Sequence, residues 1–312
     1  IYLNADYYYM KTTDLLFGMP LPEYSGFSSM LKNIGILRNQ GVDIALSTVN
    51  IDRDFRWTTD INFSLNRNKI LELPEGNDIR YNVIPGHMVG IQNTNIMREG
   101  EPLGVYYGYV YDGVIQEGEE IIPGNWEKVP GGEKYKDING TRDENGDLTG
   151  EPDGKLNGDD RTIIGNPNPD FIYGINNTFT YKNFDLNIFL QGSYGNDMYS
   201  FTLMELETLR GEHNTTSIWK DRWTPSNTDT DVPMATYARG YHTSSRWIFD
   251  GSYLRVKNIA LGYNLPKSAV DRIGLEAVRL YVSGQNFLTF TNYRGYDPEV
   301  NYKGASGSSA NK

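Results

Sequence analysis

Hydrophobic and polar residues alternate along several long segments of the chain, most regularly between Phe55 and Asn66. One set of alternate positions reads Phe55, Trp57, Thr59, Ile61, Phe63 and Leu65. The intervening positions read Arg56, Thr58, Asp60, Asn62, Ser64 and Asn66. Because successive side chains of a strand point to opposite faces, this pattern predicts a β-strand with one apolar and one polar face.

Seven segments show this period of two and are predicted to be strands. They are residues 1–10, 40–50, 54–66, 170–181, 184–195, 252–264 and 277–290. Strands in globular proteins average about 5 to 6 residues, whereas a tilted strand needs about 9 to 11 to cross a bilayer. The segments have the longer, membrane-crossing length, and we predict an all-β protein.

Short and long connections alternate between these strands. The short ones are Asp52–Arg53, Lys182–Asn183 and "LPKSAVDRIGLE", which reads as a helical turn opened by Pro266. The long ones are residues 11–39, 67–169 and 196–251. In an up-and-down antiparallel barrel every second connection lies at the same end, and outer-membrane barrels have short periplasmic turns and long extracellular loops. A soluble β-sandwich gives no reason for such sorting.

Aromatic residues gather at the strand ends beside the short connections. They are Phe55, Trp57, Tyr181, Phe184, Tyr263 and Tyr281. Membrane barrels carry aromatic girdles at this level, whereas in a soluble sheet the same residues would form a cross-strand ladder. The sorted connections favour the membrane, so the row from Phe55 to Leu65 is predicted to face lipid and the row from Arg56 to Asn66 a wet lumen. Since lipid does not tolerate an open sheet edge, we expect further polypeptide to complete the barrel.

Composition narrows the function further. The chain of 312 residues has a net charge of -11 and no Cys, and it lacks an apolar run long enough for a membrane-spanning helix. The acidic balance argues against nucleic acid, and the absence of Cys excludes disulfides and thiolate chemistry. His87, His213 and His242 are scattered through loops, and no hydrolase, metalloprotease or P-loop motif occurs. We therefore expect no enzymatic activity.

Five segments together resemble a known family. They are "NIGILRNQGVDIAL", "FRWTTDINFSLNRNKILEL", "DRTIIGNPNPDFIYGINNTFTYKNFDLNIFLQGSYGND", "SYLRVKNIALGYNLP" and "VRLYVSGQNFLTFTNYRGYDPE". In this order they resemble the C-terminal barrel region of SusC-like (RagA-like) TonB-dependent transporters of Bacteroidetes. The resemblance implies a 22-stranded transmembrane antiparallel β-barrel with long extracellular loops and an N-terminal plug, in the outer membrane of a Gram-negative bacterium. It also implies active import of oligosaccharides or peptides, with a SusD-like surface lipoprotein as a lid and energy from TonB–ExbB–ExbD.

On this resemblance, residues 1–312 are the C-terminal part of the barrel domain and residues 67–169 a long extracellular loop region within it. The plug, the TonB-contacting segment, the N-terminal carboxypeptidase-like domain and the final strand after "DPE" are expected to be absent from this chain. TonB would then act through a part of the protein that lies outside the chain, and the chain alone would not transport.

The acidic loop "KDINGTRDENGDLTGEPDGKLNGDDRT" spans residues 136–162. A calcium loop supplies oxygen ligands at fixed positions around a Gly turn, and SusC-like proteins often carry an interrupted D-x-N-x-D-G version in this place. The residues that match its ligands are Asp137, Asn139, Asp153, Lys155 (through its carbonyl) and Asp160. The loop therefore predicts a structural Ca²⁺ or similar hard cation; a solvated loop with Asx turns is the alternative.

An insertion, residues 141–152, separates the two halves of this match. We expect it to leave the loop ends together as an excursion. The insertion carries Asp143, Asn145 and Asp147 at ligand spacing, but Leu148 stands where a calcium loop needs Gly.

Aromatic residues in the long connections are candidates to face substrate or a partner protein, because their rings stack on sugars and favour interfaces. The candidates are Tyr107, Tyr109, Trp126, Trp219, Trp223 and Trp247. Packing among the loops is the alternative explanation for each. "SFTLMELETLR" (200–210) reads as a short amphipathic helix that buries Leu203, Leu206 and Leu209.

Polar residues predicted to face the lumen either line a substrate path or merely keep the interior wet and hold the plug. They include Asp60, Asn62, Asn66, Asn187 and Gln191. Two other functions stay open. A soluble calcium-dependent carbohydrate-binding β-domain explains the acidic loop and the tyrosines but not the sorted connections. A passive porin or adhesin barrel would lack the plug and the TonB-contacting segment.

Overall fold

The computed structural model describes residues 1–20, 29–33, 35–73, 76–81, 94–146, 148–211, 214–237 and 239–299. The chain forms two compact units. The strand unit comprises residues 1–77, 168–196 and 250–293, and the loop unit comprises residues 78–167, 197–249 and the segment from Arg294. His87, His213 and Asp147 lie outside the described residues.

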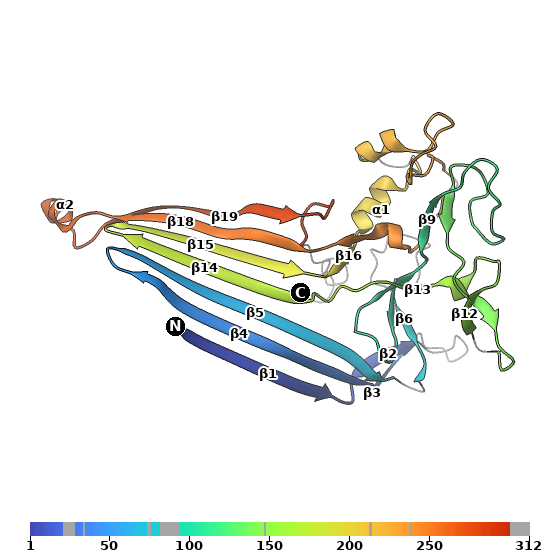
Figure 1. Ribbon diagram of the computed structural model, residues 1–312, viewed down its shortest axis with the longest axis horizontal. Helices are drawn as coiled ribbons and strands as arrows, with labels where there is room; N and C mark the ends of the chain where they lie inside the picture. The colour runs from blue at the N-terminus through green and yellow to red at the C-terminus, as the bar shows by residue number, and fades with distance from the viewer. Residues whose placement is uncertain are drawn as a thin grey trace. The chain divides into compact units, whose positions relative to one another are not determined.

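The strand unit is a sheet of seven antiparallel strands (Figure 1). In sheet order these are β1 (Tyr2–Thr12), β4 (Ile36–Asp52), β5 (Phe55–Glu72), β14 (Phe171–Tyr181), β15 (Phe184–Tyr194), β18 (Tyr253–Asn264) and β19 (Arg279–Thr291). Within this sheet, neighbouring strands follow one another in chain order. The short strands β2 (Leu16–Pro20) and β3 (Ser29–Asn33) pair with each other as a separate hairpin. All seven predicted strands are confirmed.

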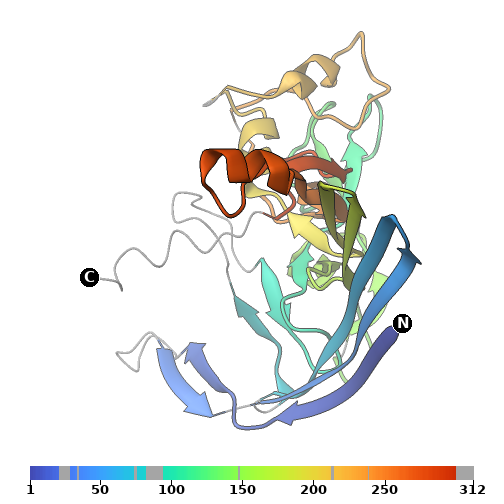
Figure 2. The same ribbon diagram turned by 90° about the vertical axis from the view of Figure 1, so that its left-hand side faces the viewer.

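Short connections occur at the three predicted places, the first shifted by one residue from Asp52–Arg53, and they lie at one end of the sheet (Figure 1). Figure 2 views the unit from that end. Arg53 and Asp54 join β4 to β5, and Lys182 with Asn183 joins β14 to β15. Lys182 adopts a left-handed φ of 51°, as a two-residue hairpin turn requires. The third connection contains the helical turn α2 (Lys267–Val270), which follows Pro266 as predicted.

Strand pairing sorts the side chains into an apolar and a polar face, because residues directly opposite in neighbouring strands share a face. One row crosses all seven strands as Leu3, Leu46, Ile61, Ile175, Leu190, Val256 and Leu288. The next row along the strands reads Asn4, Ala45, Asn62, Gly174, Gln191, Arg255 and Thr289. The alternation seen within single strands therefore holds across the whole sheet.

The apolar face is not the wall of a compact core. Phe55 is 38% exposed and Leu288 49%, and Trp57, Ile61 and Phe63 are only half-buried. An apolar surface that extends over seven strands is far larger than the patches soluble monomers expose. Such a face requires an apolar environment, in agreement with the prediction that it contacts lipid.

The loop unit is built from short elements. A four-stranded sheet has the order β13 (Thr162–Gly165), β8 (Tyr106–Gly108), β7 (Asn95–Met97) and β6 (Ile79–Tyr81). The remaining strands pair as β9 (Tyr111–Val114) with β10 (Glu133–Tyr135), β11 (Gly140–Arg142) with β12 (Leu148–Pro152), and β16 (Asp197–Tyr199) with β17 (Ile248–Asp250). The 3-10 helices of this unit are η3 (Gly158–Asp160), η4 (Ser217–Asp221) and η5 (Ser245–Trp247). One core cluster joins Ile96, Val105 and Tyr107, and another joins Tyr199, Met204 and Trp247.

The predicted amphipathic helix is α1 (Phe201–Glu207), whose first turn is capped by the Ser200 side chain accepting a hydrogen bond from the Leu203 N–H. Leu203 and Leu209 are buried, and Leu206 is half-buried. Among the residues that the structure describes, no helix is long and apolar enough to cross a membrane.

Candidate functional site

The polar face of the strand unit holds a cavity of about 460 Å³. Its polar lining includes Asn4, Asp6, Asp43, Asn62, Gln191 and Tyr253. Two of the residues predicted to face the lumen, Asn62 and Gln191, thus line this cavity. Hydrogen bonds tie others together across strands: Ser47 donates to Asp60 (2.6 Å), and Asn187 donates to Asn176 (2.8 Å). The polar face is thus cross-linked by hydrogen bonds and concave at this place, with Ile172 and Phe189 among the residues that line the cavity.

The acidic loop of the loop unit keeps its ends together, as predicted. Strands β11 and β12 pair Gly140 with Pro152, so the insertion forms a hairpin. The Asp137 carboxylate accepts hydrogen bonds from the N–H groups of Asp153 (3.3 Å) and Gly154 (2.6 Å). Asp153 in turn accepts from the N–H of Lys155 (2.9 Å). Residues far apart in the loop therefore meet at the base of the hairpin.

The second half of the match centres on Asp160, which is fully buried. One of its carboxylate oxygens accepts the N–H groups of Ile138 (3.0 Å) and Asn139 (3.2 Å), and the other accepts the Asn157 N–H (2.7 Å). An oxygen that accepts two hydrogen bonds has no lone pair left, so Asp160 can offer a cation one oxygen in this arrangement.

Within the described part of the chain no group of three or more His, Asp or Glu side chains is arranged around a common metal position. In the insertion, the Asp143 carboxylate accepts the Asn145 N–H (2.9 Å) in an Asx turn. The Ca²⁺ site stays a prediction.

Three of the six aromatic candidates are buried. Tyr107 is 3% exposed, Trp223 6% and Trp247 2%. Tyr107 and Trp247 belong to the two core clusters, and the Trp223 indole N–H donates to Gln116 (3.3 Å). In this structure their rings pack within the loop unit.

Tyr109 and Trp126 form an aromatic cluster with Tyr135 and His242. The Trp126 indole is 42% exposed and stacks on the His242 imidazole at 3.8 Å between ring centroids. Tyr109 meets it edge-on at 4.9 Å, and Tyr135 does so at 5.1 Å. Burial lowers the pKa of His242, against the opposing effect of the Glu133 charge. In this cluster the half-buried His242 imidazole therefore supports the exposed Trp126 indole from one side.

Trp219, 43% exposed, stands apart from this cluster. The Arg222 guanidinium lies 3.8 Å from the centre of its ring, in a cation–π contact.

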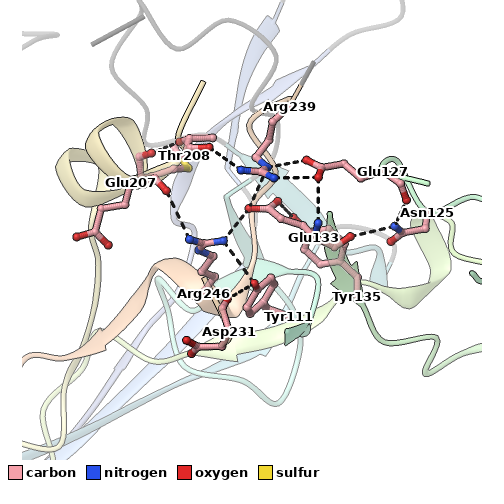
Figure 3. Close-up of polar contacts among 11 residues, drawn as sticks. Tyr111, Asn125, Glu127, Glu133, Tyr135, Glu207, Thr208, Asp231, Arg239 and Arg246 are labelled. Carbon is pink, nitrogen blue, oxygen red and sulfur yellow. Dashed lines mark hydrogen bonds and ion pairs between the residues drawn. The ribbon is translucent and has the colours of Figure 1, made fainter. Parts of the chain in front are cut away.

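A buried ion-pair network holds the loop unit together, and nothing in the sequence indicated it (Figure 3). The Arg239 side chain is inaccessible to solvent and donates two hydrogen bonds to Glu127, at 2.6 and 2.9 Å. It also donates to the Thr208 carbonyl (2.8 Å). Arg246 donates to Glu133 (3.0 Å), which accepts the Tyr135 hydroxyl (2.5 Å).

Neighbouring carboxylates keep the buried Arg239 guanidinium of this network protonated. Burial by itself would lower the pKa of Arg239, but the hydrogen bonds to Glu127 and the Glu133 charge outweigh it and raise that pKa. Burial raises the pKa of Tyr135 well above its usual value, and the adjacent Glu133 charge adds to the effect. The tyrosines therefore stay neutral donors, and the arginines carry the positive charge.

The chain matches no family model over any part of its length. Individual relatives are nonetheless clear. TonB-dependent receptor P3 of Formosa agariphila is 46% identical over 99% of the chain, and the chain covers 30% of that protein. TonB-dependent receptor P26 of the same organism is 35% identical over 98% of the chain, again covering 30%. TonB-dependent receptor SusC of Bacteroides thetaiotaomicron is 28% identical over 95% of the chain and is covered to 28%.

Solved structures agree with these relatives. A chain of the RagAB peptide transporter superposes with a TM-score of 0.75 at 25% identity, over 95% of this chain and 30% of that one. Over nearly its whole length the chain is therefore similar to one part of the SusC-like TonB-dependent receptors. It spans about 30% of the length of these curated relatives.

The similarity to SusC-like receptors explains the strand unit. Its seven strands are a segment of the transmembrane β-barrel of this family, and in the described residues the sheet does not close on itself. The predicted fold class is confirmed. The relatives are named receptors and importers, which fits the expectation that the chain is not an enzyme.

Proposed function

We propose that the chain is part of an active outer-membrane nutrient importer of a Gram-negative bacterium. The observation that carries this proposal is the seven-stranded sheet with one continuous apolar face and one polar, cavity-bearing face. Lipid wets the first face, and the second lines a water-filled path for the nutrient.

The long connections join the strand ends opposite the short turns, so they face the outside of the cell. The exposed rings of Trp126 and Trp219 are the aromatic candidates that remain available there for substrate or for a surface lipoprotein lid. TonB–ExbB–ExbD would supply energy through a part of the receptor outside this chain. The cargo is an oligosaccharide or a peptide; the similar RagAB structure is named a peptide transporter, which supports the second of these classes.

Growth of a deletion strain on a panel of glycans and peptides tests the proposal. We expect slow growth on one substrate class, restored by the full-length receptor but not by a form lacking its TonB-contacting segment. Full rescue by that form would favour a passive porin instead. Solubility of the full-length receptor without detergent would favour a soluble binding domain and contradict the importer altogether.

A further inference from the structure

Three arginines surround one buried tyrosine in the loop unit. The guanidinium carbons of Arg161, Arg80 and Arg98 lie 4.7, 5.3 and 5.9 Å from the centre of the Tyr107 ring. We call Arg80, Arg98 and Arg161 the arginine patch. Three cations around one ring are unusual in a chain whose net charge is -11.

The four-stranded sheet assembles the patch from segments that are separate in sequence. Arg80 lies in β6, Arg98 follows β7, Tyr107 lies in β8 and Arg161 precedes β13. Strand order β13-β8-β7-β6 places all of them on neighbouring strands. The patch is therefore a product of the sheet and not of a local basic run.

Protein carboxylates neutralise only part of this charge. Arg98 is paired with Asp78 in a two-pronged contact at 2.8 and 3.1 Å. Arg80 is exposed and makes no ion pair with any residue that the structure describes. The ring of Tyr107 stabilises the cations but carries no countercharge.

Arg161 is held in place and partly desolvated. It donates a hydrogen bond to the Tyr107 carbonyl (3.0 Å), and burial lowers its pKa, with the nearby Arg80 charge acting in the same direction. Guanidinium groups present donors in a planar fork that fits carboxylate and sulfate oxygens. An oxyanion beside Arg80 and Arg161 would relieve their mutual repulsion.

An exposed aromatic ring adjoins the patch. The Arg161 guanidinium lies 5.7 Å from the centre of the Tyr109 ring, and Tyr109 contacts the Trp126 indole edge-on at 4.9 Å. One face of Trp126 is covered by His242, yet the side chain stays 42% exposed. Indole surfaces pack against the C–H faces of sugar rings, so charge and stacking are available within one small area.

We propose that the arginine patch and Trp126 form a subsite for acidic oligosaccharides. The carboxylate or sulfate ester of one sugar binds Arg80 and Arg161, and a neighbouring sugar packs on Trp126. This inference rests on the proposed import function and names the class of saccharide that it would serve.

The test measures binding to the purified full-length receptor in detergent by calorimetry. The probes are trigalacturonate, its fully methyl-esterified form, a chondroitin-sulfate tetrasaccharide, and the same tetrasaccharide after desulfation and reduction of its carboxyl groups. We expect at least one acidic probe to bind about tenfold or more tightly than its neutral counterpart, because hydrogen bonds to charged groups have that strength. Arg80→Gln should abolish this preference, and Arg80→Lys should restore part of it. The exposed Arg80 side chain contacts the Tyr107 ring but makes no ion pair with a described residue, so we expect Arg80→Gln to fold.

Lys220→Gln is the matched control, because Lys220 is also exposed, lies in the same unit and carries the same charge. An equal loss in this variant would mean a diffuse charge effect and would overturn the subsite. So would equal binding of acidic and neutral probes. A hexa-aspartate peptide serves as a further probe. If it binds as tightly as the acidic saccharides and its affinity falls as much in Arg80→Gln, the site binds acidic peptides and the saccharide subsite is wrong. If these criteria fail while TonB-dependent uptake persists, the subsite is wrong and the importer stands.

Discussion

Removal of Arg239 should destabilise the loop unit more than any exposed charge does. In Arg239→Met a flexible apolar chain of similar length replaces a side chain that is inaccessible to solvent. Glu127 and Glu133, whose side chains are 11% and 4% exposed, lose their shared cation. Breaking a buried pair by deleting one partner costs about 3–5 kcal/mol, because the remaining charge stays buried.

Hydrogen exchange of the full-length receptor resolves this effect, since the loop unit can open locally while the barrel stays folded. We expect amides in residues 125–135 and 239–247 to exchange about 150- to 5000-fold faster, which follows from an opening free energy lowered by about 3–5 kcal/mol. Amides of the strand unit should be unchanged.

Arg142→Gln provides the control. Its partner Asp159 is 2.7 Å away, but the two side chains are 50% and 36% exposed. Such surface pairs contribute about 0–1 kcal/mol. A double variant, Arg239→Met with Glu127→Gln, should cost less than Arg239→Met alone because one buried charge is removed. If Arg239→Met opened the unit no faster than Arg142→Gln does, the network would not be what holds the loop unit together.

Three further predictions concern the barrel wall, the acidic loop and His242. Ile61→Lys, in the apolar row, should lower barrel stability by about 2–4 kcal/mol in detergent or lipid unfolding titrations, whereas Asn62→Lys on the polar face should be tolerated; equal effects would mean that the faces are misassigned. Asp153→Ala should remove any calcium-dependent rise in the melting temperature of the loop region. If the natural receptor melts at the same temperature with and without chelator, the predicted Ca²⁺ site is wrong. Because burial lowers the pKa of His242, the unfolded state binds its proton first as pH falls. The contribution of His242 to loop-unit stability should therefore be fully present above about pH 6.5 and be lost as the pH falls below it. In hydrogen exchange measured as a function of pH, His242→Phe should flatten this dependence. An unchanged dependence would show that His242 does not cause it.

Much of the strand unit follows from local sequence. A period of two fixes which side chains share a face of a strand, and short turns with a left-handed or helical residue fix which strands are neighbours. All seven strands and the three short connections could be predicted for this reason. Strands β4 and β5 still extend beyond their predicted ends. Their additional residues mix polar and apolar side chains and pair with each other, as Arg38 does with Lys69 and Leu37 with Ile70.

The arrangement of side chains in the loop unit, in contrast, could not be predicted from local sequence. Sequence identified Trp126 and Trp247 as equivalent candidates, and only packing separates a 42% exposed ring from one that is 2% exposed. Family resemblance located the acidic loop, but the hydrogen bonds that join Asp137 to Gly154 depend on the hairpin between them.

The sequence by itself determined the barrel wall. The alternation of apolar and polar side chains and the preferences of turn residues depend only on residues that are close along the chain. Tertiary structure alone decided the ion-pair network and the arginine patch. Glu127 and Arg239 are 112 positions apart, and no periodic or compositional signal connects them. Their contact exists because the irregular segments fold against one another, and charge is stable there only where a partner from a distant segment reaches it.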